Sequence, residues 1–309
     1  MRPWAFIAAM LCATSVSVAF ASPKRVTDSP HFRFYYDKSR TVEVDSVQRS
    51  AEAAFDRISQ LLSFTPTQRI PVYLYSDRKE FIRDTGINRS ELVLGVATSA
   101  DEAVRLDASK IFEAPDRVVG HEIAHIFLYY DLGPSIGLLP LWMNEGIAQV
   151  AGGADGDAAR ARVSDAYVNG RLIPLGDLKS RFPVGDSAGL AYDESQDAVM
   201  ALLDYGNGWP RVRSLLSELK TAASFDAAMR SAYGMSATDW ESQWRHTAWF
   251  NARFAFWVTV AEWIVPFMMF GALVWGILTV RRHRKKQIKD EEPLVEIAPP
   301  SWWKEDQWR

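Results

Sequence analysis

Two histidines and a glutamate stand together in the short sequence HEIAH, residues 121–125. If this segment is helical, His121 and His125 lie on one face, one turn apart, and both imidazoles can reach the same metal ion. Glu122 follows the first histidine, where its carboxylate can contact a water molecule bound to that ion. The pattern therefore predicts a zinc site with a carboxylate base beside it.

A catalytic zinc site needs a third protein ligand. Glu145 stands in LWMNEGIA, residues 141–148, after a connection rich in Gly and Pro. A second, antiparallel helix would bring its carboxylate to the two imidazoles. The alternative is a surface carboxylate stabilised by the helix dipole. We favour the ligand, because no other histidine follows at the short spacing that a third-histidine site requires; the others are His31, His246 and His283.

HEIAH followed by LWMNEGIAQ resembles the gluzincin metallopeptidases, a thermolysin-like and aminopeptidase-like group with two His and one Glu on zinc. The closer resemblance is to the bacterial peptidase MA-like family. Its further motifs match a Y-x-x-S block at Tyr192, Gly208 followed by Trp209, and an S-x-x-x-x-E-x-x-W ending from Ser236 to Trp244. The resemblance covers about residues 33–250. It implies a thermolysin-like zincin fold, a bound zinc ion and peptidase activity.

The resemblance also implies individual roles. It makes His121, His125 and Glu145 the zinc ligands and Glu122 the general base. Tyr192 matches the tyrosine that steadies the tetrahedral oxyanion in the aminopeptidase branch, although it could equally be a core aromatic residue.

Two features depart from the family pattern. Gln149 stands where thermolysin-type enzymes carry an acid that supports a ligand histidine. Its amide oxygen could still accept a hydrogen bond from an imidazole, without the negative charge. The amine-binding motif of the aminopeptidases is not recognisable. Exopeptidase specificity is therefore not carried over, and we expect an endopeptidase.

The residue chemistry leads to the same mechanism. Zinc lowers the pKa of its bound water and polarises a carbonyl, while Glu122 would move a proton from the water to the leaving amine. The Tyr192 hydroxyl could donate to the oxyanion. Two alternatives stay open: a zinc hydrolase of a non-peptide substrate, and a catalytically inert, membrane-tethered scaffold on a peptidase fold. The intact Glu122 argues against the scaffold, which needs no base.

The hydrophobic pattern predicts the elements that must position these residues. Before the motif, strands and helices alternate: strands are expected at residues 31–36, 70–75, 92–97 and 103–106, and helices at residues 44–64 and 77–85. From residue 115 the pattern is almost wholly helical and is interrupted at glycines. This predicts an α+β catalytic domain, with a small sheet and helices in residues 22–114 and a helical zinc-binding half in residues 115–252.

Apolar segments flank this domain. Residues 1–21 have the pattern of a signal peptide, with Ala19 and Ala21 before the expected cut, although an uncleaved anchor is an alternative. Cleavage would remove Cys12, the single cysteine, so that His and carboxylates must hold any metal. Residues 263–280 carry no charge and precede a basic block. This predicts a transmembrane helix over residues 253–280, the alternative being a buried core helix.

A cleaved signal and a basic block after the second apolar segment agree on orientation. They predict a single-pass protein of a bacterial cell membrane, with the catalytic domain on the exported (periplasmic or extracellular) side and residues 281–309 as a cytoplasmic tail. The composition, 48% hydrophobic and 24% charged, is globular, and the net charge of −3 gives no reason to expect nucleic acid as a partner. The expected partners are a peptide or protein substrate and membrane lipid around the C-terminal helix.

Overall fold

The computed structural model describes residues 24–37, 44–87, 93–109, 111 and 115–290. The chain divides into two compact units, Met1–Ala252 and Arg253–Arg309, which are described separately. The expected signal peptide with Cys12, and the tail beyond residue 290, lie outside the described residues.

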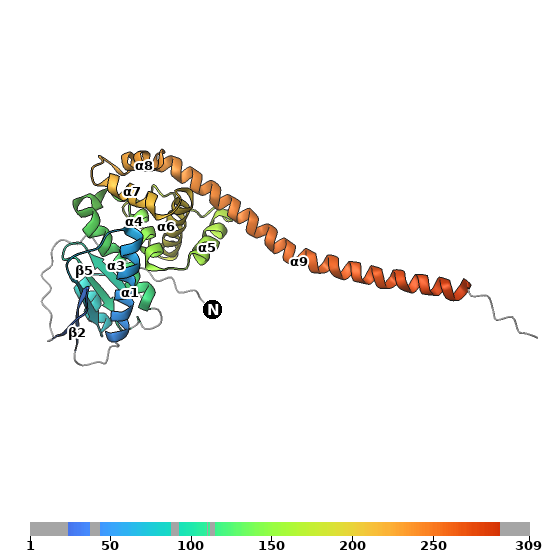
Figure 1. Ribbon diagram of the computed structural model, residues 1–309, viewed down its shortest axis with the longest axis horizontal. Helices are drawn as coiled ribbons and strands as arrows, with labels where there is room; N and C mark the ends of the chain where they lie inside the picture. Colours follow the sequence, from blue (N-terminus) through green and yellow to red (C-terminus); the bar gives the residue numbers. More distant parts are fainter. Residues whose placement is uncertain (1–23, 38–43, 88–92, 110, 112–114, 291–309) are drawn as a thin grey trace, which may run out of the picture. The chain divides into compact units, whose positions relative to one another are not determined.

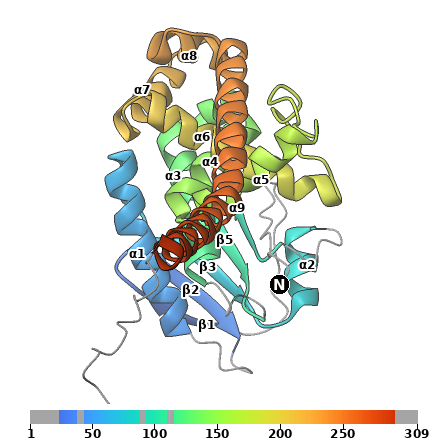
Figure 2. The same ribbon diagram turned by 90° about the vertical axis from the view of Figure 1, so that its right-hand side faces the viewer.

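A five-stranded mixed sheet forms the first part of the larger unit, in the order β1-β2-β3-β5-β4 (Figures 1 and 2). Its central strands, β2, β3 and β5, are parallel, and the two edge strands are antiparallel to their neighbours. The strands are β1 (Lys24–Asp28), β2 (Phe32–Asp37), β3 (Ile70–Tyr75), β4 (Gly95–Thr98) and β5 (Ala103–Asp107). The sequence did not predict β1, which is short and carries charges at both ends.

The two faces of the sheet are covered by different helices. Side chains such as Val72 and Leu74 belong to the main core, which α1 (Val44–Leu62) and α3 (Pro115–Leu132) complete. Tyr75 points to the other face and packs against Phe81 of α2 (Arg78–Thr85). This alternation follows from the two-residue period of a strand.

Helices make up the second part of the larger unit (Figure 1). They are α3, a short 3₁₀ helix η2 (Gly133–Leu138), α4 (Leu141–Gly152), α5 (Gly156–Val168), α6 (Asp186–Tyr205), α7 (Trp209–Leu219), α8 (Phe225–Tyr233) and the start of α9 (Ala237–Asp290). The protein therefore has a mixed α/β fold, mostly helical with a small sheet, which confirms the coarse architecture expected from the sequence.

Helix α4 packs against both α3 and α6, and glycines allow the close approach on each side. A Cβ atom added at Gly120 of α3 would lie 2.8 Å from the backbone oxygen of Gly152 in α4. One added at Gly146 would lie only 2.2 Å from the backbone oxygen of Ser195 in α6. These glycines are the direct neighbours of His121 and Glu145, so the contacts set how close the motif residues come.

The Gly146→Ala substitution should destabilise the fold, because its methyl group meets backbone rather than a movable side chain. We expect a loss of about 3 kcal/mol or more in unfolding free energy, the upper end of the overpacking range. Gly137→Ala is the matched control, since nothing lies within 4 Å of a Cβ there. Denaturant unfolding followed by circular dichroism measures both, and equal stability of the two variants would contradict the packing argument.

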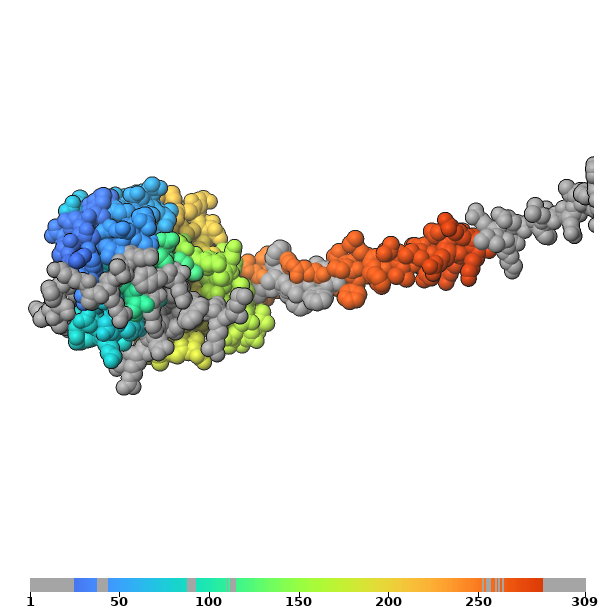
Figure 3. Space-filling model, turned by 90° about the horizontal axis from the view of Figure 1, so that it is seen from below, coloured from blue at the N-terminus to red at the C-terminus, as the bar shows by residue number. Residues whose placement is uncertain are grey.

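Among the described residues of the smaller unit, one helix segment, Ile264–Lys285 within α9, is long and apolar enough to cross a membrane. Its side chains are largely exposed, Phe267 by 72% and Trp275 by 73% (Figure 3, orange to red). An apolar surface of this kind is stable when lipid surrounds it.

Candidate metal centre

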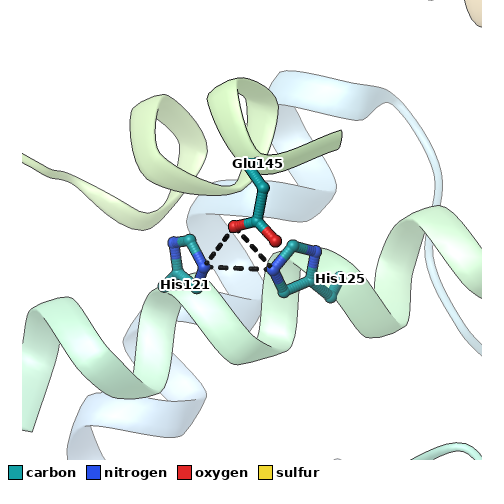
Figure 4. Close-up of side chains that lie close together, drawn as sticks. All are labelled: His121, His125 and Glu145. Atoms are coloured by element: carbon teal, nitrogen blue, oxygen red, sulfur yellow. Dashed lines mark hydrogen bonds and ion pairs between the residues drawn. The ribbon is translucent and has the colours of Figure 1, made fainter. Parts of the chain in front are cut away.

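The side chains of His121, His125 and Glu145 converge on one point between α3 and α4 (Figure 4). The two Nε2 atoms lie 3.0 Å apart. The Glu145 Oε2 atom lies 3.2 Å from Nε2 of His121 and 3.5 Å from Nε2 of His125. The structure therefore brings the three predicted ligands together into a group that could hold a metal ion.

Local structure explains how Glu145 arrives there. Helix α3 ends at Leu132, η2 turns the chain, and α4 begins after Pro140. The first two N–H groups of α4, those of Leu141 and Trp142, have no acceptor inside the helix. They donate to the backbone oxygens of Lys179 and Leu178 at 2.8 and 3.1 Å. These bonds satisfy part of the open helix end and fix the start of the helix that carries Glu145.

Asn144 orients one of the imidazoles. Its Oδ1 lies 2.8 Å from Nδ1 of His125, and both side chains are buried. An amide oxygen can only accept, so Nδ1 of His125 carries a hydrogen and Nε2 is the nitrogen that faces His121 and Glu145. Burial opposes the imidazole charge, but Glu145 outweighs it and raises the pKa of His125 to about 9, so a metal ion bound at Nε2 would displace a proton. The sequence reasoning missed this residue, although Asn144 directly precedes Glu145 in the second motif.

The electrostatics of the group favour a bound cation. Burial disfavours the charged carboxylate, but the facing imidazoles outweigh it and hold the pKa of Glu145 below its usual value. Burial lowers the pKa of His121 and so favours its neutral form, which can ligate a metal. The Oε2 atom of Glu145 is buried, and its polar neighbours within the described part of the chain are the two imidazole Nε2 atoms. Two imidazole nitrogens and this oxygen suit zinc.

Glu122 lies beside the group, packed against the edge strand β4. A Cβ atom at Gly95 would be 2.7 Å from Cγ of Glu122, so only glycine leaves room for the carboxylate. Burial raises the pKa of Glu122 to about 8, while His125 and the backbone of Ala97 act in the opposite direction. A carboxyl group with a raised pKa is a stronger base when ionised, as proton transfer requires.

Strand β4 turns part of its backbone toward Glu122. The Asp107 N–H donates to the Leu94 oxygen at 2.8 Å, so these two opposite residues are a hydrogen-bonded pair of the antiparallel strands β4 and β5. Hydrogen-bonded and non-hydrogen-bonded pairs alternate along such strands. The N–H and C=O groups of Gly95 and Ala97 therefore point away from β5, and on that side the Ala97 oxygen accepts from the Tyr129 hydroxyl at 3.4 Å.

Tyr192 enters from α6 and is largely buried. Burial, followed by the negative charges of Glu145 and Glu122, raises its pKa well above the usual value. The phenol therefore stays protonated and can donate a hydrogen bond. Its ring packs edge-on against the Phe182 ring, with the centroids 4.8 Å apart.

Gln149 links α4 to α6 in a way that the sequence did not predict. Its amide nitrogen donates to the backbone oxygen of Tyr192 at 2.8 Å. Gln149, which stands where thermolysin-type enzymes carry an acid, therefore connects α4 to α6, the helix that carries Tyr192.

Other residues that matched family motifs have structural partners. Ser195, which ends the Y-x-x-S block, donates its hydroxyl to the backbone oxygen of Ala191 at 2.7 Å. Trp244 donates its indole N–H to Asp197 at 2.9 Å, which joins α9 to α6. Of the remaining histidines in the larger unit, His31 pairs with Glu52, and His246 lies against Trp249.

Comparison with known families gives one match. The model of a family described as the peptidase MA superfamily matches residues 50–250, which is more than half of the chain. The matched range contains the three converging side chains together with Glu122 and Tyr192. No curated protein matches the chain.

Proposed function

The chain belongs to the peptidase MA superfamily, and from this premise we propose that it is a zinc metallopeptidase of the gluzincin type, held in a membrane by its C-terminal helix. The observation that carries the proposal is the convergence of His121, His125 and Glu145 beside the buried Glu122. The same proposal includes a thermolysin-like arrangement of the domain around these residues.

Each side chain has a distinct task in this proposal. His121, His125 and Glu145 would hold the zinc ion, which supplies a Lewis acid that activates water and polarises the substrate carbonyl. Glu122 accepts the proton of the attacking water and returns it to the leaving amine. Tyr192 donates its hydroxyl hydrogen to the developing oxyanion. Asn144 keeps the ring of His125 in its orientation.

A peptide is the substrate best suited to the surroundings of Glu122. The side of β4 that is turned away from β5 carries the N–H and C=O groups of Gly95, and an extended peptide can pair with the edge strand of a sheet. Within the described residues, no strand pairs with that side of β4. A peptide added there would bring its backbone next to the Glu122 carboxylate, which packs on Gly95.

The direct test uses the full chain in detergent, with metal analysis and digestion of a generic unfolded protein. We expect about one zinc ion per chain, and cleavage that a chelator stops and added zinc restores. A zinc-loaded protein that hydrolyses esters but no peptide would favour a non-peptide hydrolase. A protein that binds zinc and hydrolyses neither would favour the inert scaffold.

The Tyr192→Phe variant tests the oxyanion donor. If the hydroxyl contacts the oxyanion, turnover should fall by roughly 10- to 1,000-fold while KM changes little, because the contact exists mainly in the transition state. Phe fills nearly the same volume, so the melting temperature should stay close to that of the wild type. Steady-state kinetics on a cleaved peptide gives both constants, and unchanged turnover would assign the donor to another group.

We also propose that the larger unit lies on the exported side of a bacterial membrane and that the tail is cytoplasmic. The support is the apolar segment Ile264–Lys285, whose last residues are basic. A topology reporter fused after Arg309 should then read as cytoplasmic, and one fused after Phe250 as exported. The same reading at both positions would mean that the segment does not span the membrane.

A further inference from the structure

Arg57 of α1 closes the C-terminal end of α4, the helix that carries Glu145. Its Nε donates to the backbone oxygen of Ala151 at 2.9 Å, and its Nη2 donates to that of Gly152 at 3.0 Å. One planar guanidinium thus holds two neighbouring carbonyls of α4 in a fork, a geometry that the single ammonium group of a lysine does not supply.

These are the two carbonyls that no other backbone group of this helix end satisfies. The last four carbonyls of a helix have no N–H partner within it. The first two of them accept from the N–H groups of Ala154 and Gly153, at 2.9 and 3.2 Å respectively. Those of Ala151 and Gly152 remain, and the last turn of α4 carries no basic side chain of its own. The cation from α1 therefore completes a helix end where the dipole favours positive charge.

The same end of α4 lies directly on the backbone of His121. A Cβ atom added at Gly152 would be 2.8 Å from the backbone nitrogen of His121 and 3.0 Å from its Cα. On the α3 side, a Cβ atom added at Gly120 would be 2.9 Å from Nη2 of Arg57. The guanidinium, the end of α4 and the backbone next to His121 are therefore in direct contact, because both positions carry glycine.

His121 thus meets α4 at two points. Gly152 follows Glu145 by seven residues, which is about two helical turns, or about 10 Å along the axis, so both lie on the same side of α4. At one point Oε2 of Glu145 lies 3.2 Å from Nε2 of His121. At the other, Gly152 rests on the backbone of the same histidine. The two contacts fix α4 on α3, and Arg57 holds the second of them.

We propose that Arg57 is a positioning residue of the metal centre, which holds the end of α4 on α3 and thereby keeps the Glu145 carboxylate at its distance from the His121 imidazole. The inference rests on the proposed zinc site and adds a residue that lies outside both motifs. Arg57 acts through backbone contacts. Without its fork, two carbonyls lose their partner and the end of α4 can shift along α3, which moves Glu145 relative to His121.

The test measures metal binding in the full chain in detergent. Arg57→Met keeps an unbranched side chain and removes its donors. In competition with a zinc-binding dye, we expect zinc affinity to fall by about tenfold, the lower end of the range for loss of an outer partner, because Arg57 acts through the backbone. With cobalt(II) in place of zinc, visible absorption reports the ligand geometry, and its bands should change in the variant. Arg57→Lys should fall between Arg57→Met and the wild type.

Arg213→Met is the matched control. Arg213 of α7 is also a partly buried arginine that donates to a carbonyl near a helix C-terminus, that of Leu61 in α1, at 2.9 Å. Its loss should lower the melting temperature in a similar way but leave zinc affinity and the cobalt spectrum as in the wild type. An equal fall in zinc affinity in both variants would reduce Arg57 to a general contributor to stability and overturn the inference.

Wild-type zinc affinity with an unchanged cobalt spectrum in Arg57→Met would also overturn the inference and leave the zinc site standing. If Arg57→Met does not fold, Arg57→Lys measured against Arg213→Lys decides by the same criteria. A wild type that binds zinc but cleaves no peptide would refute the peptidase function and leave the positioning role intact. Failure of the wild type to bind zinc would overturn both.

Discussion

The Glu122→Gln variant should lose nearly all turnover while keeping its zinc and its fold. Glutamine has almost the same shape, so it can occupy the space that Gly95 leaves beside β4. Its amide cannot accept a proton from water, and we expect turnover to fall by about 100-fold or more, the range of general-base catalysis. Glu122 is not among the three converging side chains, so zinc binding should persist. Thermal stability should be equal or higher, because burial opposes the carboxylate charge.

Three measurements on one preparation decide this prediction: zinc content, melting temperature and the rate of peptide cleavage. Glu80→Gln is the matched control, because Glu80 lies on α2, on the other face of the sheet, and should leave all three unchanged. Wild-type turnover in Glu122→Gln would exclude Glu122 as the base. Loss of zinc in the same variant would instead give it a part in metal binding.

Local patterns in the sequence were enough to predict several elements. The strand at residues 70–75 forms with those bounds, since its β-branched and aromatic residues favour extended backbone. The helix expected at residues 77–85 begins one residue later, because Asp77 is its N-cap and accepts from the Lys79 N–H. It ends at Gly86, which adopts a positive φ of 67°. Strand propensity, an N-cap residue and a C-terminal glycine each act within one strand or one helical turn, so the sequence alone shows them.

The order of the strands could not be predicted in this way. Parallel pairing of β3 with β5 brings Val72 next to Val104, and nothing in either strand specifies that partner. The edge strand β1 was missed because Lys24, Arg25 and Asp28 give it no alternating apolar pattern. Its stability comes from pairing with β2, which is a tertiary effect.

The candidate site shows the same division. The histidine spacing on one helix predicted the pair His121 and His125, and the second motif predicted Glu145. The supporting contacts join residues of different helices, such as Asn144 to His125 and Gln149 to Tyr192. The motif that ends at Trp244 was recognised, but its hydrogen bond to Asp197 depends on how α9 packs on α6. Motifs therefore predicted which three side chains converge, while the contacts that support them could be found only in the structure.

The Glu145→Ala variant should lose most of its zinc and, with it, all measurable peptidase activity. The substitution removes the only anionic donor of the converging group and leaves two neutral imidazoles. We expect zinc affinity to fall by more than about 100-fold, because removal of an outer hydrogen-bond partner alone costs about 10- to 100-fold. Asn144→Ala removes such an outer partner from His125 and should fall within that smaller range.

Glu194→Gln is the matched control for the loss of a buried carboxylate. Glu194 is buried on α6 and accepts from the Ile173 N–H, a bond that glutamine can keep. Competition with a zinc-binding dye should therefore rank affinity as wild type and Glu194→Gln first, Asn144→Ala next and Glu145→Ala last. Stoichiometric zinc of wild-type affinity in Glu145→Ala would remove Glu145 from the ligand set. A ranking with Asn144→Ala below Glu145→Ala would show that the orientation of His125 matters more for the metal than the charge of the third ligand.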